Sequence, residues 1–254
     1  MGAGSEGPLR AWQAAQASGQ NICYHPSVWR RPALALDTWR EHGYNSVVCL
    51  VLTPMEKEER LRACVTLGRC CGFDEAHCRQ DTRLALRLFD LLEERLDLPD
   101  GARHILECAA LLHDIGYAEG YEGHHKTAYR LIMNSSLPGL TDHQKKLVAN
   151  VARYHRGARP DEKHSGYASL GVDDRALVVL LAAVLRLADG LDRTHSSAVR
   201  DVDVYSEGDR LVVLVHCPSG CDAELWAGEK KGRLLGDALG QRVEVRESAG
   251  IEGQ

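Results

Sequence analysis

The chain has 254 residues, of which 44% are hydrophobic and 26% are charged. These fractions are close to the averages for soluble globular proteins and exclude a disordered or fibrous chain. The length is sufficient for a hydrophobic core without stabilising disulfides. The formal net charge is −5, from 31 basic and 36 acidic side chains, and the basic residues are scattered along the sequence. We therefore do not expect a nucleic acid as a partner.

Neither a membrane nor a secreted environment is expected. The longest apolar run, residues 176–185, is about half of the roughly 20 residues that cross a bilayer, and no basic, hydrophobic leader opens the sequence. The 9 cysteines are irregularly spaced and match no disulfide framework, which favours reduced thiols. These features predict a cytoplasmic protein.

The N-terminal segment, residues 1–55, is poorly patterned. A valine-rich apolar run at residues 46–52 predicts one buried strand. The segment gives little information on function.

Residues 56–198 have a helical hydrophobic period almost throughout. Asp74 is a candidate N-cap, and Thr141 to Gln144 fits the capping-box pattern. Asp173 or Asp174 can cap a long helix that runs to about residue 195. Gly72 and Gly116 are candidate stops for the helices expected at residues 58–71 and 101–115. Together these signals predict a bundle of about five to seven helices.

The pattern changes after residue 199. Residues 201–205 and 210–216 flank a hairpin signal at residues 207–209, and an amphipathic helix at 223–239 and a strand at 242–246 follow. The predicted fold class is mainly α, a helical bundle with a small β-β-α-β appendix at residues 199–247. The strand at 46–52 is expected to add to this sheet, and the appendix is also a candidate surface for a homodimer.

Two carboxylates lie in the most apolar parts of the helical zone. His113 and Asp114 follow the apolar run at residues 109–112, and Asp189 follows the run at 184–188. Burying such groups unpaired costs several kcal/mol. A divalent cation removes this cost because neutral imidazole and carboxylate become its ligands. Arg186, Arg193 or another local base would serve as a counter-charge instead, and the residues alone leave both interpretations open.

The order His77, His113-Asp114, Asp189 resembles the H…HD…D signature of the HD-domain metal-dependent phosphohydrolase superfamily. Longer stretches are similar to one branch, the C-terminal helical domain of exopolyphosphatases and guanosine pentaphosphate phosphatases. They are residues 61–94, HHKTAYRLIMNSSLPGL (124–140), VARYHR (151–156), RLADGLDRTH (186–195) and ELWAGEKKGRLLGDALG (224–240). No glycine-rich phosphate loop precedes them, so the similarity does not extend to the actin-like catalytic half of those enzymes.

The resemblance implies an HD-type helical bundle with one or two divalent transition metal ions, of Fe, Mn, Co, Ni or Zn. In subfamilies with two metals, additional histidines bind the second ion and the Asp of the HD pair bridges both. The implied ligands in this chain are His77, His113, Asp114, His125, His155 and Asp189.

Three further residues near these ligands have weaker interpretations. Asp81 departs from the family, which usually has an aliphatic residue there; one helical turn after His77, it either orients that imidazole or is solvated, and we favour the latter. His124 is interpreted as a support for the ligands. His195 is interpreted as a cap or hydrogen-bond partner near Asp192.

The charge of such a site predicts its substrate. Two divalent ions with two carboxylates and neutral imidazoles leave about two surplus positive charges, which suits an anionic phosphate attacked by a metal-activated water. Asp114 is then catalytic, and Lys126, Arg156 and Arg193 are candidate phosphate-binding residues, although solvated side chains fit nearly as well.

The predicted function is a metal-dependent phosphohydrolase that cleaves a phosphomonoester or phosphoanhydride bond in a nucleotide or another small phosphorylated metabolite. The alternative is a non-catalytic regulatory module that binds nucleotides or polyphosphate.

Overall fold

The computed structural model describes residues 54–96 and 98–248. The strand predicted at residues 46–52 lies outside these ranges. Within them the fold is mainly α with a small β-β-α-β appendix, as predicted. None of the described helices is long and apolar enough to span a membrane.

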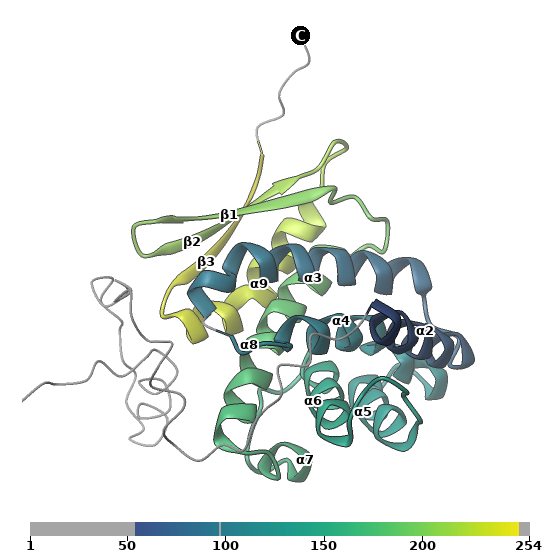
Figure 1. The fold of residues 1–254 in the computed structure, drawn as a ribbon. Coiled ribbons are helices and arrows are strands. Elements are labelled where there is room, and N and C mark those ends of the chain that lie inside the picture. Colours follow the sequence, from purple (N-terminus) through teal and green to yellow (C-terminus); the bar gives the residue numbers. More distant parts are fainter. Residues whose placement is uncertain (1–53, 97, 249–254) are drawn as a thin grey trace, which may run out of the picture.

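Helices make up the first part of the described chain. They are α2 (Pro54–Cys70), α3 (Glu75–Leu96), α4 (Ala102–Leu112), the 3-10 helix η3 (Ile115–Glu119), α5 (His124–Asn134), α6 (Asp142–Arg153), α7 (Ser165–Ala168) and α8 (Val172–Gly190). The appendix follows with β1 (Asp201–Glu207), β2 (Arg210–His216), α9 (Asp222–Leu239) and β3 (Arg242–Glu247). The sheet lies on one side of α3, and α4, α5 and α6 lie on the other (Figure 1).

Two of the predicted helix starts are confirmed. The Asp74 carboxylate accepts a hydrogen bond from the His77 amide at 3.1 Å, which caps the start of α3. Thr141 and Gln144 make both hydrogen bonds of the capping box at the start of α6.

The predicted cap of α8 is wrong. Its N-cap is Gly171. Asp173 and Asp174 lie in the first turn, where their negative charges interact favourably with the positive end of the helix dipole. The helix ends at Gly190, not near residue 195.

The end of α4 also differs from the prediction. The helix ends at Leu112, and the chain turns at Asp114 into η3. Gly116 is not a left-handed stop; a Cβ at this position would lie 1.9 Å from the carbonyl oxygen of His124. Glycine is required here because η3 packs directly against the first turn of α5. This contact brings His124 towards Asp114.

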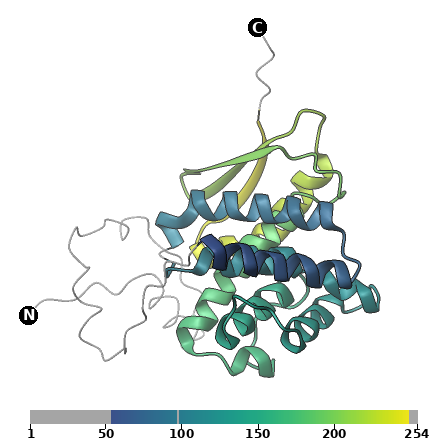
Figure 2. The same cartoon turned by 45° about the vertical axis from the view of Figure 1, so that its right-hand side comes forward.

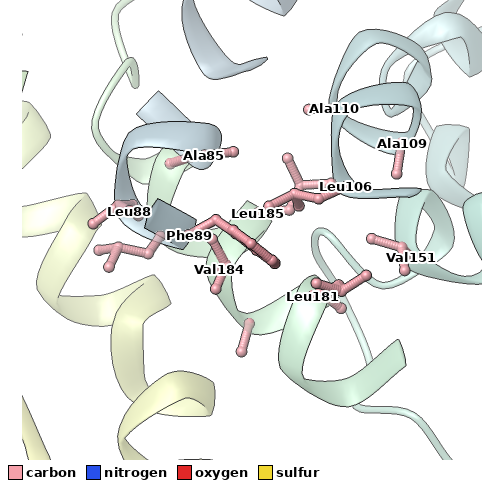
Figure 3. Packing of buried hydrophobic residues seen from close by; sticks show 14 of the residues in the cluster. Ala85, Leu88, Phe89, Leu106, Ala109, Ala110, Val151, Leu181, Val184 and Leu185 are labelled. Atoms are coloured by element: carbon pink, nitrogen blue, oxygen red, sulfur yellow. The ribbon is translucent and has the colours of Figure 1, made fainter. Parts of the chain in front are cut away.

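The core is formed mainly by α3, α4, α6 and α8. Figure 3 shows Leu88 and Phe89 of α3, Leu106 of α4 and Leu185 of α8 in one cluster of buried side chains. Every residue of α8 from 176 to 185 is buried, as expected for an apolar helix at the centre of a bundle. A rigid helix at this place fixes the position of Asp189 at its end.

The appendix contains a three-stranded sheet of order β1-β2-β3 in the described residues. β1 and β2 are antiparallel, and β2 and β3 are parallel, so α9 is the crossover between them. Figure 2 shows the sheet and the bundle on opposite sides of α3 in a second view. α9 lies directly against the end of α8, because a Cβ on Gly190 would be 3.0 Å from the Ala227 carbonyl oxygen. The appendix thereby reaches Asp189.

Candidate metal centre

A cluster of histidine and aspartate side chains lies where α3, α5, α8 and the ends of α4 and α6 meet. Each of these residues is at most 9% exposed. We call this the donor cluster; it consists of His77, Asp81, His113, Asp114, His124, His155 and Asp189.

One part of the cluster, the inner group, contains His77, Asp81, His113 and Asp189. These residues offer ligand atoms that all lie within 4.8 Å of one another. The Nε2 atoms of His77 and His113 are each 3.4 Å from Oδ2 of Asp81. A shared ion would therefore receive mixed nitrogen and oxygen ligands from three helices.

The other part, the outer group, contains His124 and His155 around Asp114. Oδ1 of Asp114 is 3.2 Å from Nε2 of His124 and 3.4 Å from Nε2 of His155. Its other oxygen, Oδ2, is 3.4 Å from Nε2 of His113 and 3.7 Å from Nε2 of His77. Asp114 thus faces both groups, one oxygen to each, in the manner of a bridging ligand.

All four imidazoles of the cluster are oriented through their Nδ1 atoms. Each Nδ1 lies within hydrogen-bond distance of an acceptor, so it carries a hydrogen, and in the neutral imidazole Nε2 carries the lone pair. The acceptors are Asp192 Oδ2 for His77 (2.8 Å), Ala110 O for His113 (2.7 Å), Tyr121 O for His124 (3.0 Å) and Ala152 O for His155 (2.6 Å). Fixing Nδ1 in this way is how proteins aim histidine Nε2 at a metal.

Several buried polar atoms of the inner group have no hydrogen-bond partner. They are Nε2 of His77, Nε2 of His113 and both carboxylate oxygens of Asp81. A buried acceptor left unpaired costs about 1–3 kcal/mol. Lone pairs of nitrogen and oxygen that face one another at 3.4 Å repel unless a positive charge lies between them. A divalent cation fits this donor set because it accepts all of these lone pairs at once.

The pKa values of the cluster indicate how it balances charge through protons. Burial raises the pKa of Asp81 well above its ordinary value. Burial alone would lower the pKa of His113, but the neighbouring Asp114 raises it well above the ordinary value. The charge of His113 in turn holds the pKa of Asp114 well below the ordinary value, against the effect of burial. Protons thus compete with a cation for the lone pairs of Asp81 and His113.

The resemblance assigned His125 as a ligand, but His124 is the histidine that faces the cluster. His125 is half-buried against Gly157, and its ring is perpendicular to that of His124 with centroids 6.0 Å apart. Adjacent residues on a helix point about 100° apart, so only one of the pair can face inward. Sequence alone did not give the rotation of α5.

The interpretation of Asp81 as solvated is wrong, because this residue is fully buried. It lies on the same face of α3 as His77, and this spacing was the available signal. The carboxylate that orients His77 is instead Asp192, which also accepts a hydrogen bond from the Ser197 amide at 2.8 Å. Its position three residues after Asp189 is a signal that sequence reasoning did not use.

The bases predicted around the site divide into two kinds. Lys126 and Arg193 are exposed and lie outside the donor cluster. Arg156 is half-buried, with Nη1 3.5 Å from Nε2 of His124. Of the two bases proposed to neutralise the carboxylates, Arg186 binds backbone carbonyls, among them that of Tyr154.

The base that does pair with a cluster carboxylate comes from the appendix. Lys231 of α9 donates a hydrogen bond to Oδ2 of Asp189, while Oδ1 of Asp189 lies 4.0 Å from Nε2 of His77. Asp189 thus has one oxygen held by Lys231 and one turned to the inner group. Sequence spacing gave no signal for this pair, because the two residues belong to different elements.

His195 covers the outer side of His77. The two rings are stacked, with centroids 3.6 Å apart and an angle of 7° between their planes. His195 Nδ1 is 3.1 Å from Asp74 Oδ2, and the His195 amide donates to the Asp192 carbonyl oxygen, near the place predicted for it. Its backbone has φ +56°, an uncommon value for a residue with a side chain.

Comparison with known proteins identifies the family. The family model described as Ppx/GppA phosphatase, domain III, matches residues 60–217, which include the whole donor cluster. The chain is also similar to guanosine-5'-triphosphate,3'-diphosphate pyrophosphatase of Vibrio vulnificus (strain YJ016), with 31% identity over 147 residues. This alignment covers 56% of the chain but only 28% of that relative. The resemblance to the exopolyphosphatase branch is therefore confirmed, and the chain belongs to the Ppx/GppA phosphatase domain III family.

Proposed function

We propose that this chain is an HD-type metal-dependent phosphohydrolase that cleaves a phosphoanhydride or phosphomonoester bond in a nucleotide or another small phosphorylated metabolite. The observation that carries the proposal is the orientation of the four buried imidazoles. Each has Nδ1 committed to an acceptor and Nε2 turned towards carboxylate oxygens. A cation is the group that these facing lone pairs can share.

The donor cluster would hold one or two ions. The inner group together with Asp114 offers ligands for the first, and Asp114, His124 and His155 offer ligands for the second. Bound divalent ions would supply positive charge for a phosphate and a nucleophile at neutral pH.

The exposure of the donors supports access for a substrate from one side. The side chains of Asp114 and Asp189 are 9% and 13% exposed, whereas those of His77 and Asp81 are 1% and 0% exposed. A phosphate would thus approach past Asp114 and Asp189. Arg156, beside His124, would meet the phosphate oxygens there with a guanidinium that can form paired hydrogen bonds.

The family supports a phosphoanhydride as the bond that is cleaved. The relative from Vibrio vulnificus is named for an activity on guanosine-5'-triphosphate,3'-diphosphate. Since the chain aligns with only 28% of that protein, we include its activity only as part of this proposal.

The proposal is tested by reloading stripped protein with Mn, Fe, Co, Ni or Zn. Metal content and phosphate release from nucleotides, dinucleotides, polyphosphate and p-nitrophenyl phosphate are then measured. We expect near-stoichiometric metal and turnover, both lost in Asp114→Asn and both kept in Lys126→Ala, whose side chain is exposed.

A non-catalytic binding module is the second candidate. It is favoured by the small part of the relative that the chain covers, 28%, since the remainder of that protein is not represented in the alignment. Metal-loaded protein that binds nucleotide or polyphosphate without releasing phosphate from any of these substrates would establish this function and contradict the enzyme.

A further inference from the structure

Two exposed tyrosines lie together at the edge of the donor cluster. Tyr117 in η3 is 40% exposed and Tyr121 is 68% exposed, and their ring centroids are 5.8 Å apart. Single exposed hydrophobic side chains are normal on a protein surface, whereas adjoining ones rimmed by polar residues are candidates for a binding surface. Among the described residues, the other large exposed hydrophobic side chains are Val172, Tyr205 and Trp226.

Both tyrosines are held in fixed positions relative to the donor cluster. The ring of Tyr117 is stacked on that of His124, with centroids 4.0 Å apart and an interplanar angle of 27°. The carbonyl oxygen of Tyr121 accepts the hydrogen bond from His124 Nδ1 at 3.0 Å. The close contact of Gly116 with the His124 carbonyl oxygen fixes the same turn. The aromatic surface is therefore built onto a candidate ligand of the outer group.

Arg156 connects this surface to the donor cluster. Its guanidinium carbon lies 5.5 Å from the centroid of the Tyr121 ring, and its Nη1 lies 3.5 Å from Nε2 of His124. A positive charge suited to phosphate thus lies beside both the aromatic surface and the candidate metal site. A nucleotide likewise has a charged phosphate at one end and an aromatic base at the other.

We infer that Tyr117, Tyr121 and Arg156 form a nucleoside subsite, in which a base stacks on the tyrosines while its phosphates reach Arg156 and the donor cluster. Stacking on aromatic side chains does not select among the bases, because every base has a π face. The inference rests on the proposed function and narrows its substrates to nucleoside phosphates. Inorganic polyphosphate has no aromatic ring, so this surface would not raise its binding affinity.

The experiment compares two ligands that share a diphosphonate and differ only in the nucleoside: α,β-methylene guanosine diphosphate and methylenediphosphonate. Their affinities for the metal-loaded full chain are measured by calorimetry. The variants are Tyr121→Ala and Tyr117→Leu, with Tyr121→Phe and Tyr117→Phe as variants that keep the ring. Tyr205→Ala in β1 is the matched control, since Tyr205 is 39% exposed and lies in the sheet.

We expect Tyr121→Ala and Tyr117→Leu each to lower the affinity for the nucleotide analogue roughly tenfold, through the loss of base stacking. The affinity for methylenediphosphonate should not change. The ring-keeping variants and Tyr205→Ala should bind both ligands as the parent protein does. Unchanged metal content shows that a variant is folded. If an Ala or Leu variant loses its metal, the Phe variant at that position and the variants of the other tyrosine decide whether the subsite exists.

Three results would overturn the subsite. The first is an equal loss for both ligands, which would mean that the tyrosines act only on the outer group. The second is no loss for either ligand. The third is a parent protein that binds methylenediphosphonate as tightly as the analogue, which would leave the proposed phosphohydrolase intact. A parent protein that holds metal but binds neither ligand would contradict the proposed function as well.

Discussion

The inner and outer groups of the donor cluster satisfy their polar atoms in different ways. In the inner group, Nε2 of His77, Nε2 of His113 and both oxygens of Asp81 are buried without a hydrogen-bond partner. In the outer group, Nε2 of His124 lies 3.2 Å from Oδ1 of Asp114 and 3.5 Å from Nη1 of Arg156, a donor for its lone pair. The inner group therefore needs positive charge from protons or from a cation, whereas the outer group has a neighbouring donor in Arg156.

Charge follows the same division. Asp81, Asp189 and one oxygen of Asp114 face the inner group, and only the other oxygen of Asp114 faces the outer group. More carboxylate ligands bind a divalent cation more tightly. We therefore expect a tight inner ion and a weaker outer one.

The largest effect is expected at the residue that both groups share. Asp114→Asn should remove both ions and lower phosphate release by more than about 100-fold, because even residues that merely support metal ligands contribute about 10- to 100-fold. Metal content and kcat/KM measure the effect. Asp90→Asn, an exposed carboxylate that pairs with Arg103, is the control and should change neither. An Asp114→Asn variant with full metal content would contradict a bridging role.

Metal affinity should depend strongly on pH. The raised pKa values of Asp81 and His113 in the metal-free protein mean that protons compete with an ion at these two residues. Affinity should thus rise with pH, by about tenfold per pH unit for each proton released. Titrations at about pH 6 and about pH 8, in buffers of different ionisation enthalpy, measure both the affinity and the number of protons. Affinity that is constant over this range would contradict competition between protons and the ion at these residues.

The two groups can be separated by a pair of substitutions. Asp81→Asn should lower the affinity for the tightly bound ion about 10- to 100-fold, since it removes a buried charged ligand. His124→Gln should leave the affinity for the tightly bound ion unchanged and lower only the affinity for the second ion. Calorimetric titration with Mn²⁺ resolves the two events. Loss of the tight ion in His124→Gln would show that the groups are not independent.

The smallest effect is expected from the appendix. Lys231→Met should lower kcat/KM about tenfold, because Asp189 is then free to turn away from the inner group. The neighbouring Lys230 lies over the Trp226 ring at 4.8 Å, so Lys230→Met is a matched control with no expected effect. Equal losses in the two variants would indicate that general positive charge on α9, not the pair with Asp189, matters.

Several local features were readable from the sequence. The capping box at Thr141, the Asp74 cap and the β-β-α-β appendix depend on neighbours in the chain, and the structure confirms all three. The His113-Asp114 pair was also recognisable, because a histidine and a carboxylate at the end of an apolar helix need a counter-charge wherever that helix lies.

Other features depend on how distant elements pack. The inward position of His124 in place of His125 follows from the rotation of α5, which the contact of Gly116 with α5 sets. The pair of Lys231 and Asp189 requires α9 to lie against the end of α8, which a glycine at position 190 allows. Sequence periodicity gives the face of a helix but not its neighbours. The types of ligand were thus determined locally, and the identity of the facing side chains was decided only by tertiary packing.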